Sequence, residues 1–110
     1  MDKLIELLTK KNINFVVINN KVKVLGLSVL LINGREPVIM QAGCIRFDLK
    51  DHMQLPIDIF DALIDREKIN IDWQQYDDII NIPNLYIIFN NKTVTVKQEG
   101  ISEPILEIKL

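Results

Sequence analysis

Several short stretches of the chain alternate between apolar and polar residues, which is the pattern of strands with one buried face. Residues 13–18 are rich in β-branched side chains and are followed by Asn19-Asn20 and a second alternating stretch that starts at Lys21. Because asparagine tolerates positive φ angles, this arrangement predicts a β-hairpin. Residues 85–96, with Asn90-Asn91 at their centre, predict another hairpin in the same way.

The two predicted hairpins share a short motif. Residues 15–21 read Phe-Val-Val-Ile-Asn-Asn-Lys, and residues 86–92 read Tyr-Ile-Ile-Phe-Asn-Asn-Lys. Since the match covers only seven positions, we interpret it as convergence on one stable hairpin rather than as an internal duplication.

Further strands are predicted on either side of the chain's midpoint. From Leu27 to Ile32 both alternating faces are apolar, so this strand is expected to be covered on both sides or to lie in a subunit interface. Asn33-Gly34 predicts a turn into a strand at 38–40. Two further alternating stretches predict a half-exposed strand at 44–49 and a final edge strand at 104–110.

Helical spacing of apolar residues predicts two or three helices. The first covers residues 3–11, and the second begins at Pro56 and ends near Lys68. A third, short helix is expected from Asp72 to the residue before Pro83. The apolar stripes assigned to the three helices are Leu4, Leu7 and Leu8; Ile57, Phe60, Leu63 and Ile64; and Trp73, Tyr76, Ile79 and Ile80.

These elements predict an α+β fold in which an antiparallel β-sheet, built from at least two hairpins, is packed by two or three helices. The expected order is α-β-β-β-β-α-α-β-β-β. The 110 residues are the usual size of one compact unit, so residues 1–110 are read as a single small α+β domain.

Composition supports a soluble chain with an aliphatic core. Hydrophobic residues make up 48% of the chain and include 19 isoleucines, but the longest apolar stretch, Val24 to Ile32, is too short to span a membrane. The N-terminus has no secretory signal pattern, and the single Cys44 excludes an internal disulfide, so a cytoplasmic location is expected. The abundance of Ile, Asn and Lys is typical of AT-rich bacterial or phage genomes.

No motif for catalysis or for a cofactor is recognisable, so no catalytic residue and no cofactor are predicted. The chain has one histidine and one cysteine, too few for an ordinary zinc site. The weak metal-ligand candidates Asp48, Asp51 and His52 are interpreted as solvated loop residues, although a small metal-dependent hydrolase stays open as an alternative.

Charge is unevenly distributed along the chain. Residues 48–78 carry a net charge of −6, whereas the whole chain carries −2. Such acids can be the ordinary polar face of a helix, or they can form a surface that docks on a basic partner. The acidic balance disfavours direct nucleic-acid binding. The candidate partner-binding residues are Asp58, Asp61, Asp65, Asp72, Asp77 and Asp78.

The favoured function is therefore a protein-binding domain and not an enzyme. We expect a small inhibitor, immunity or accessory protein of a bacterial or phage genome, whose acidic helix face docks on a basic protein such as a nucleic-acid-handling enzyme. A structural subunit of a virion or another complex is the first alternative. It would form a homo-oligomer through residues 27–32 and the terminal strand.

Overall fold

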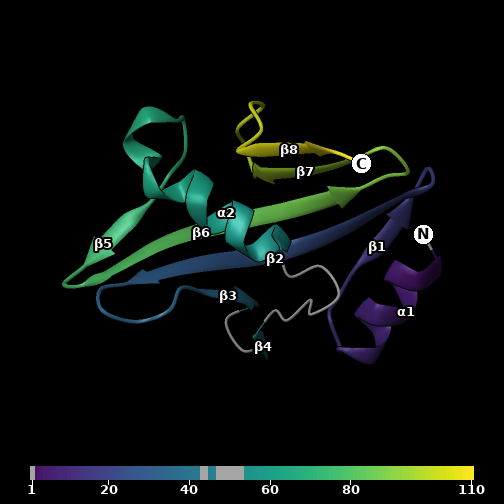
Figure 1. The fold of residues 1–110 in the computed structure, drawn as a ribbon, viewed down its shortest axis with the longest axis horizontal. Coiled ribbons are helices and arrows are strands. Elements are labelled where there is room, and N and C mark those ends of the chain that lie inside the picture. Colours follow the sequence, from purple (N-terminus) through teal and green to yellow (C-terminus); the bar gives the residue numbers. More distant parts are fainter. Residues whose placement is uncertain (1, 43–44, 47–53) are drawn as a thin grey trace.

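The computed structural model describes residues 2–42, 45–46 and 54–110. Every strand pairing among these residues is antiparallel, and the fold is mixed α+β, as the sequence predicts. The elements, shown in Figure 1, are α1 (Asp2–Lys10), β1 (Val16–Ile18), β2 (Lys21–Ile32), β3 (Val38–Gln41), β4 (Ile45–Arg46), α2 (Gln54–Ile64), the 3₁₀ helix η2 (Arg66–Lys68), β5 (Gln74–Tyr76), β6 (Ile79–Phe89), β7 (Thr93–Gln98) and β8 (Leu106–Lys109).

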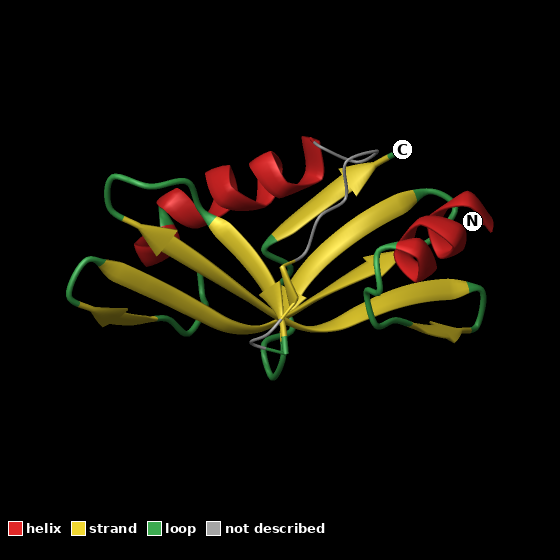
Figure 2. Cartoon of the chain, turned by 90° about the horizontal axis from the view of Figure 1, so that it is seen from below, coloured by secondary structure: helices red, strands yellow, loops and turns green. Residues whose placement is uncertain are grey.

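The described strands form one sheet around two long central strands, β2 and β6. The order across the sheet is β4-β3-β2-β6-β7-β8, with β1 paired to β2 and β5 paired to β6. The sheet is therefore built in the same way on both sides of the β2–β6 pair. Figure 2 shows the result as two similar wings that diverge from the middle of the molecule.

The two wings are structural repeats related by a shift of 58 residues in β1 and β2 and of 57 residues in β3. Adding 58 to both members of the pair Val16–Lys23 gives Gln74–Asn81, which is also a pair. The same shift maps the β2–β6 register onto itself, and its pair Leu27–Leu85 maps onto itself. An approximate two-fold axis therefore passes between Leu27 and Leu85.

The motif shared by residues 15–21 and 86–92 does not follow this repeat. It matches β1–β2 to β6–β7, whereas the repeat matches β1–β2 to β5–β6. The likeness of those two hairpins therefore does not mark the structural repeat, and the repeat itself was not visible as a sequence match.

The helix expected between Asp72 and Pro83 is wrong. This segment instead forms β5, a turn at Asp77-Asp78 and the start of β6. Apolar residues three and four apart allow a helix, but ladder hydrogen bonds to β6 decide the conformation here. Proline has no backbone N–H to donate to a ladder. Pro83 is nevertheless tolerated inside β6 because it lies at a bulge.

Each central strand carries one bulge, and the two bulges are equivalent positions. The β2–β6 register shifts on both sides of Leu27, at the level of Gly26 and Asn84. These two residues, 58 apart, have φ angles of 71° and 59°. Glycine and asparagine are the residues that adopt this left-handed conformation most readily.

Two buried glutamines hold these bulges. The side-chain amide of Gln41 accepts a hydrogen bond from the N–H of Asn14 at 2.8 Å and donates to the carbonyl groups of Asn14 at 2.7 Å and Leu25 at 3.0 Å. Gln98 makes the equivalent contacts with Asp72 and Pro83 at 2.7 to 2.8 Å. Both glutamines are 2% exposed and are the only buried polar residues among those described.

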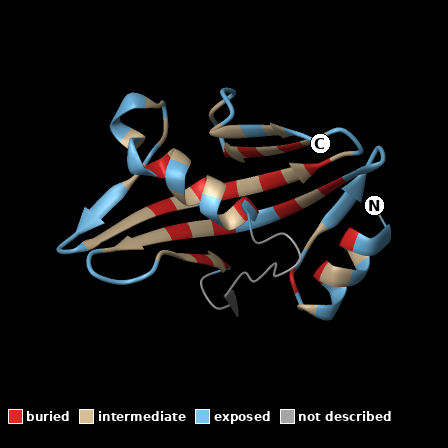
Figure 3. Ribbon diagram, viewed as in Figure 1, coloured by how far each residue is buried: buried red, intermediate tan, exposed pale blue. Residues whose placement is uncertain are grey.

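Apolar residues on one face of the sheet form the core together with residues of both helices. Leu4 and Leu8 of α1 and Leu55, Ile59 and Leu63 of α2 belong to the same buried cluster as the inner residues of β2, β6 and β7. Figure 3 shows these buried positions alternating along the central strands. Ile57 and Ile64, assigned to the apolar stripe of α2 from the sequence, are exposed instead.

Removing one glutamine amide should destabilise the fold strongly. In Gln98→Met, the side chain keeps its approximate length but leaves three backbone groups without partners, so the free energy of unfolding should fall by about 3 kcal/mol. Chemical denaturation measures this loss, with Gln75→Met at an exposed position as the control. A loss below about 1 kcal/mol would show that the hydrogen bonds of the Gln98 side chain contribute little to stability.

The repeat also predicts which residue position 26 tolerates. A Cβ atom at Gly26 meets open space, so Gly26→Ala should cost only the left-handed backbone strain, about 1 kcal/mol. Gly26→Asn introduces the residue found at the equivalent Asn84 and should cost less. Denaturation of both variants tests this, and a larger loss for the asparagine variant would contradict it.

Candidate acidic docking site

The acids predicted on α2 do not form one continuous exposed row. Asp58 is half-buried, and its carboxylate accepts a hydrogen bond from Nε2 of Gln54 at 2.9 Å. Asp61 is exposed on the helix, whereas Asp65 follows the helix end at Ile64 and precedes η2. The helical spacing of these three aspartates therefore applies only to Asp58 and Asp61.

The other three predicted acids lie on the β5–β6 hairpin. Asp72 is exposed and is fixed by its backbone, which Gln98 holds through both its N–H and its carbonyl group. Asp77 and Asp78 form the turn between β5 and β6 and are exposed as well. The structure thus places Asp77 and Asp78, which are neighbours in the sequence, at the exposed turn of the hairpin.

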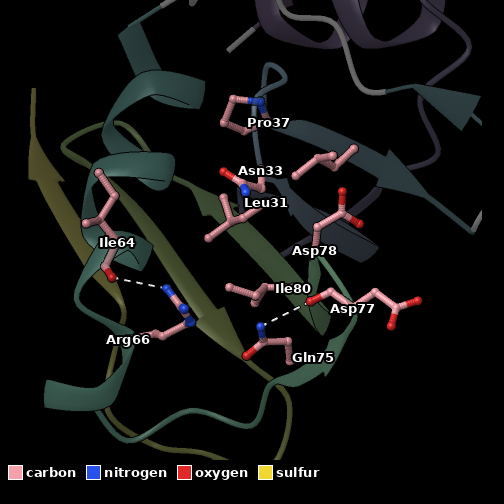
Figure 4. Close-up of a pocket in the computed structure, with 10 residues that line it drawn as sticks. Leu31, Asn33, Pro37, Ile64, Arg66, Gln75, Asp77, Asp78 and Ile80 are labelled. Carbon is pink, nitrogen blue, oxygen red and sulfur yellow. Dashed lines mark hydrogen bonds between the residues drawn. The ribbon is translucent and has the colours of Figure 1, made fainter.

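An open pocket of about 530 Å³ lies beside this turn. Leu31 and Ile80 of the central strands and Ile64 at the end of α2 give it an apolar lining, while Gln75, Asp77 and Asp78 supply polar groups. In Figure 4, Ile64 and Arg66 lie on one side of the pocket and Asp77 and Asp78 on the other. The pocket therefore combines apolar surface with polar groups of Arg66, Gln75 and the two turn residues Asp77 and Asp78.

Arg66 is held by its own surroundings in this pocket. Its guanidinium group lies 4.7 Å from the centre of the Trp73 ring, a cation–π geometry, and Nη1 donates to the carbonyl of Ile64 at 3.1 Å. Its Nε is buried and has no hydrogen-bond partner among the described residues. Arg66 is thus held against the end of α2 and the Trp73 ring.

Charge is separated along the longest dimension of the molecule, which is 41 Å. The β5 hairpin, residues 70–82, carries three aspartates and no basic residue. The equivalent residues 12–24 around β1 carry only Lys21 and Lys23 as charged residues. Because β1 and β5 lie at opposite ends in Figure 1, one end of the chain is acidic and the other is basic.

Sequence reasoning found the acids but missed the pocket and the role of Arg66. The pocket depends on bringing Leu31, Ile64 and Ile80 together, and these residues lie on three elements. The pattern of Trp73 seven residues after Arg66 carries no recognised signal for a stacked pair.

The weak metal candidates Asp48, Asp51 and His52 lie outside the described residues, as does Cys44. Within the described ranges, no three His, Cys, Asp or Glu side chains gather closely enough to hold a metal ion. No described helix has both the length and the apolar character needed to cross a membrane.

Comparisons with protein-family models, with curated proteins and with solved structures find no match to this chain.

Neutralising the acidic turn should leave the fold intact. Asp77→Asn/Asp78→Asn recreates the Asn19-Asn20 pair of the equivalent hairpin, and asparagine suits the φ angle of 53° at position 77. The free energy of unfolding should stay within about 0.5 kcal/mol of the parent or rise slightly. Denaturation tests this, and a loss above about 1.5 kcal/mol would show that the carboxylates stabilise the fold.

Proposed function

We propose that this chain is a non-catalytic protein-binding domain whose acidic end docks on a basic surface of another protein. The inhibitor, immunity and accessory proteins of bacterial or phage genomes are the functional classes that this mode of action fits. The observation that carries the proposal is the pocket beside the β5–β6 turn, with Asp77 and Asp78 at its side.

The pocket has the chemistry to receive a lysine or arginine side chain. The aliphatic stem of such a side chain would lie on Leu31, Ile64 and Ile80, and its charged end would reach the carboxylates of the turn. Ile64 is 63% exposed, so a partner that covers it gains apolar burial as well as charge pairing. Asp61 and Asp65, exposed nearby on the same segment, extend the attraction beyond the pocket.

The fold supports a rigid docking surface rather than an adaptable one. Asp72 is anchored through Gln98, and the turn that carries Asp77 and Asp78 closes a hairpin on a central strand. We take α1 and α2 to be the helices that pack the sheet from one face, and we place the protein in the cytoplasm, where a single cysteine stays reduced.

A comparative capture experiment tests the proposal. Immobilised protein is incubated with an extract of the cells that naturally contain it, and captured proteins are quantified by mass spectrometry for the parent chain and for Asp77→Asn/Asp78→Asn. A basic partner should be captured by the parent, be lost from the variant, and be released by salt because exposed charges are screened.

Lys21→Gln/Lys23→Gln is the matched control, because it removes two charges from the equivalent hairpin at the other end. Loss of the same partner from both variants would point to a non-specific charge effect. Undiminished capture by the aspartate variant would overturn the acidic end as the docking site.

A further inference from the structure

Strand β1 exposes three consecutive apolar residues at an edge of the sheet. Val16, Val17 and Ile18 are 41%, 54% and 48% exposed, and β1 pairs only with β2 among the described strands. Natural proteins usually protect such edges with charged residues, prolines or cover from other elements, because an open apolar edge invites another strand.

The repeat supplies an internal control for this edge. The equivalent strand β5 has the sequence Gln-Gln-Tyr at the same register against β6. The fold is therefore compatible with polar residues at two of these three positions, while Tyr76, the equivalent of Ile18, is also exposed, so packing within the chain does not require Val16 and Val17 to be apolar.

The backbone of β1 is also ready to accept a strand. Ile18 and Lys21 flank the two-residue turn at Asn19-Asn20, whose φ angles of 51° and 63° are those of a type I′ turn. In such a hairpin the flanking pair exchanges hydrogen bonds, so the N–H and carbonyl groups of Val17 point away from β2. Tyr76 and Ile79 likewise flank a two-residue turn, so the backbone groups of Gln75 in β5 point away from β6.

Charge complementarity selects the strand that fits this edge. The β1 hairpin is purely basic, with Lys21 and Lys23, and the β5 hairpin is purely acidic, with Asp72, Asp77 and Asp78. Two β1 edges brought together would place four lysines near one another, which like-charge repulsion disfavours. A β1 edge against a β5 edge instead brings opposite charges together.

Strand direction agrees with this choice. The approximate two-fold axis makes β1 and β5 run in opposite directions on opposite ends of one molecule, as Figure 1 shows. Two copies in the same orientation therefore present β1 and β5 as an antiparallel pair, with Val17 opposite Gln75. We propose that the β1 edge of one copy pairs with the β5 edge of a second copy, forming a head-to-tail assembly.

This inference rests on the proposed use of the acidic end and names a second copy of the chain as its partner. Because each copy uses two different edges, the contact is heterologous, and further copies can add at either end. The assembly should be a concentration-dependent series rather than a closed dimer, and salt should weaken it.

Proline substitutions at the two outward-facing backbone positions test the pairing. Val17→Pro and Gln75→Pro each remove an N–H group that points away from the neighbouring strand, so no ladder bond within the monomer is lost. Sedimentation velocity on the full-length chain, up to millimolar concentration, should show association of the parent and monomers for each variant alone. An equimolar mixture of the two variants should form a one-to-one complex, because each supplies the intact edge that the other lacks.

The other outcomes contradict the proposal. A parent chain that stays monomeric at all concentrations would overturn it. A Gln75→Pro variant that still dimerises would also overturn it, since β1 would then pair with itself.

Circular dichroism checks that each variant is folded. If a proline variant does not fold, Asp77→Asn/Asp78→Asn takes its place and should weaken parent association by about tenfold. A monomeric parent that still captures a basic protein through its acidic end would overturn only this inference and leave the proposed function standing.

Discussion

The fold depends on the pairing of β2 with β6 and on the two bulges that this pairing contains. At each bulge the strand turns its carbonyl group out of the ladder, and a buried carbonyl without a partner is costly. Gln41 and Gln98 supply the missing donors and at the same time hold the segments that enter β1 and β5. The side-chain amide of Gln41 therefore joins β3 to β2 and to the segment before β1. The side-chain amide of Gln98 joins β7 to β6 and to the segment before β5.

How far the sequence predicts this arrangement depends on whether the signal is local. The hairpin at Asn19-Asn20, the helix beginning near Pro56 and the long strand ending at Ile32 follow from turn chemistry and periodicity, and the structure contains all three. The repeat was missed because equivalent positions share burial and backbone conformation rather than identity, as Gly26 and Asn84 or Phe15 and Trp73 illustrate. The helix expected after Asp72 failed because the apolar spacing fits a helix in a local window, whereas β5 pairs with β6 and β6 is held by β2, a strand far away in the chain.

The candidate site shows the same division. All six aspartates could be listed from charge density alone, but only the fold places Asp77 and Asp78 beside apolar residues of β2, α2 and β6. Asp65 was placed on a helix that ends one residue earlier, so its helical spacing to Asp61 does not describe their arrangement. Local sequence therefore identifies which residues are charged, and the sheet decides which of them can act together.

A two-fold repeat turns differences between its halves into evidence about function. Positions that both wings need for folding are similar in character, such as the two glutamines and the buried pair Ile39 and Val96. Positions that differ without a packing reason are free to serve another purpose, and the differences between β1 and β5 are of this kind. Their charges are opposite and their apolar exposure is unequal, although their backbones have the same register. This asymmetry, at positions with the same strand register, is the observation on which the proposed recognition between unlike surfaces rests.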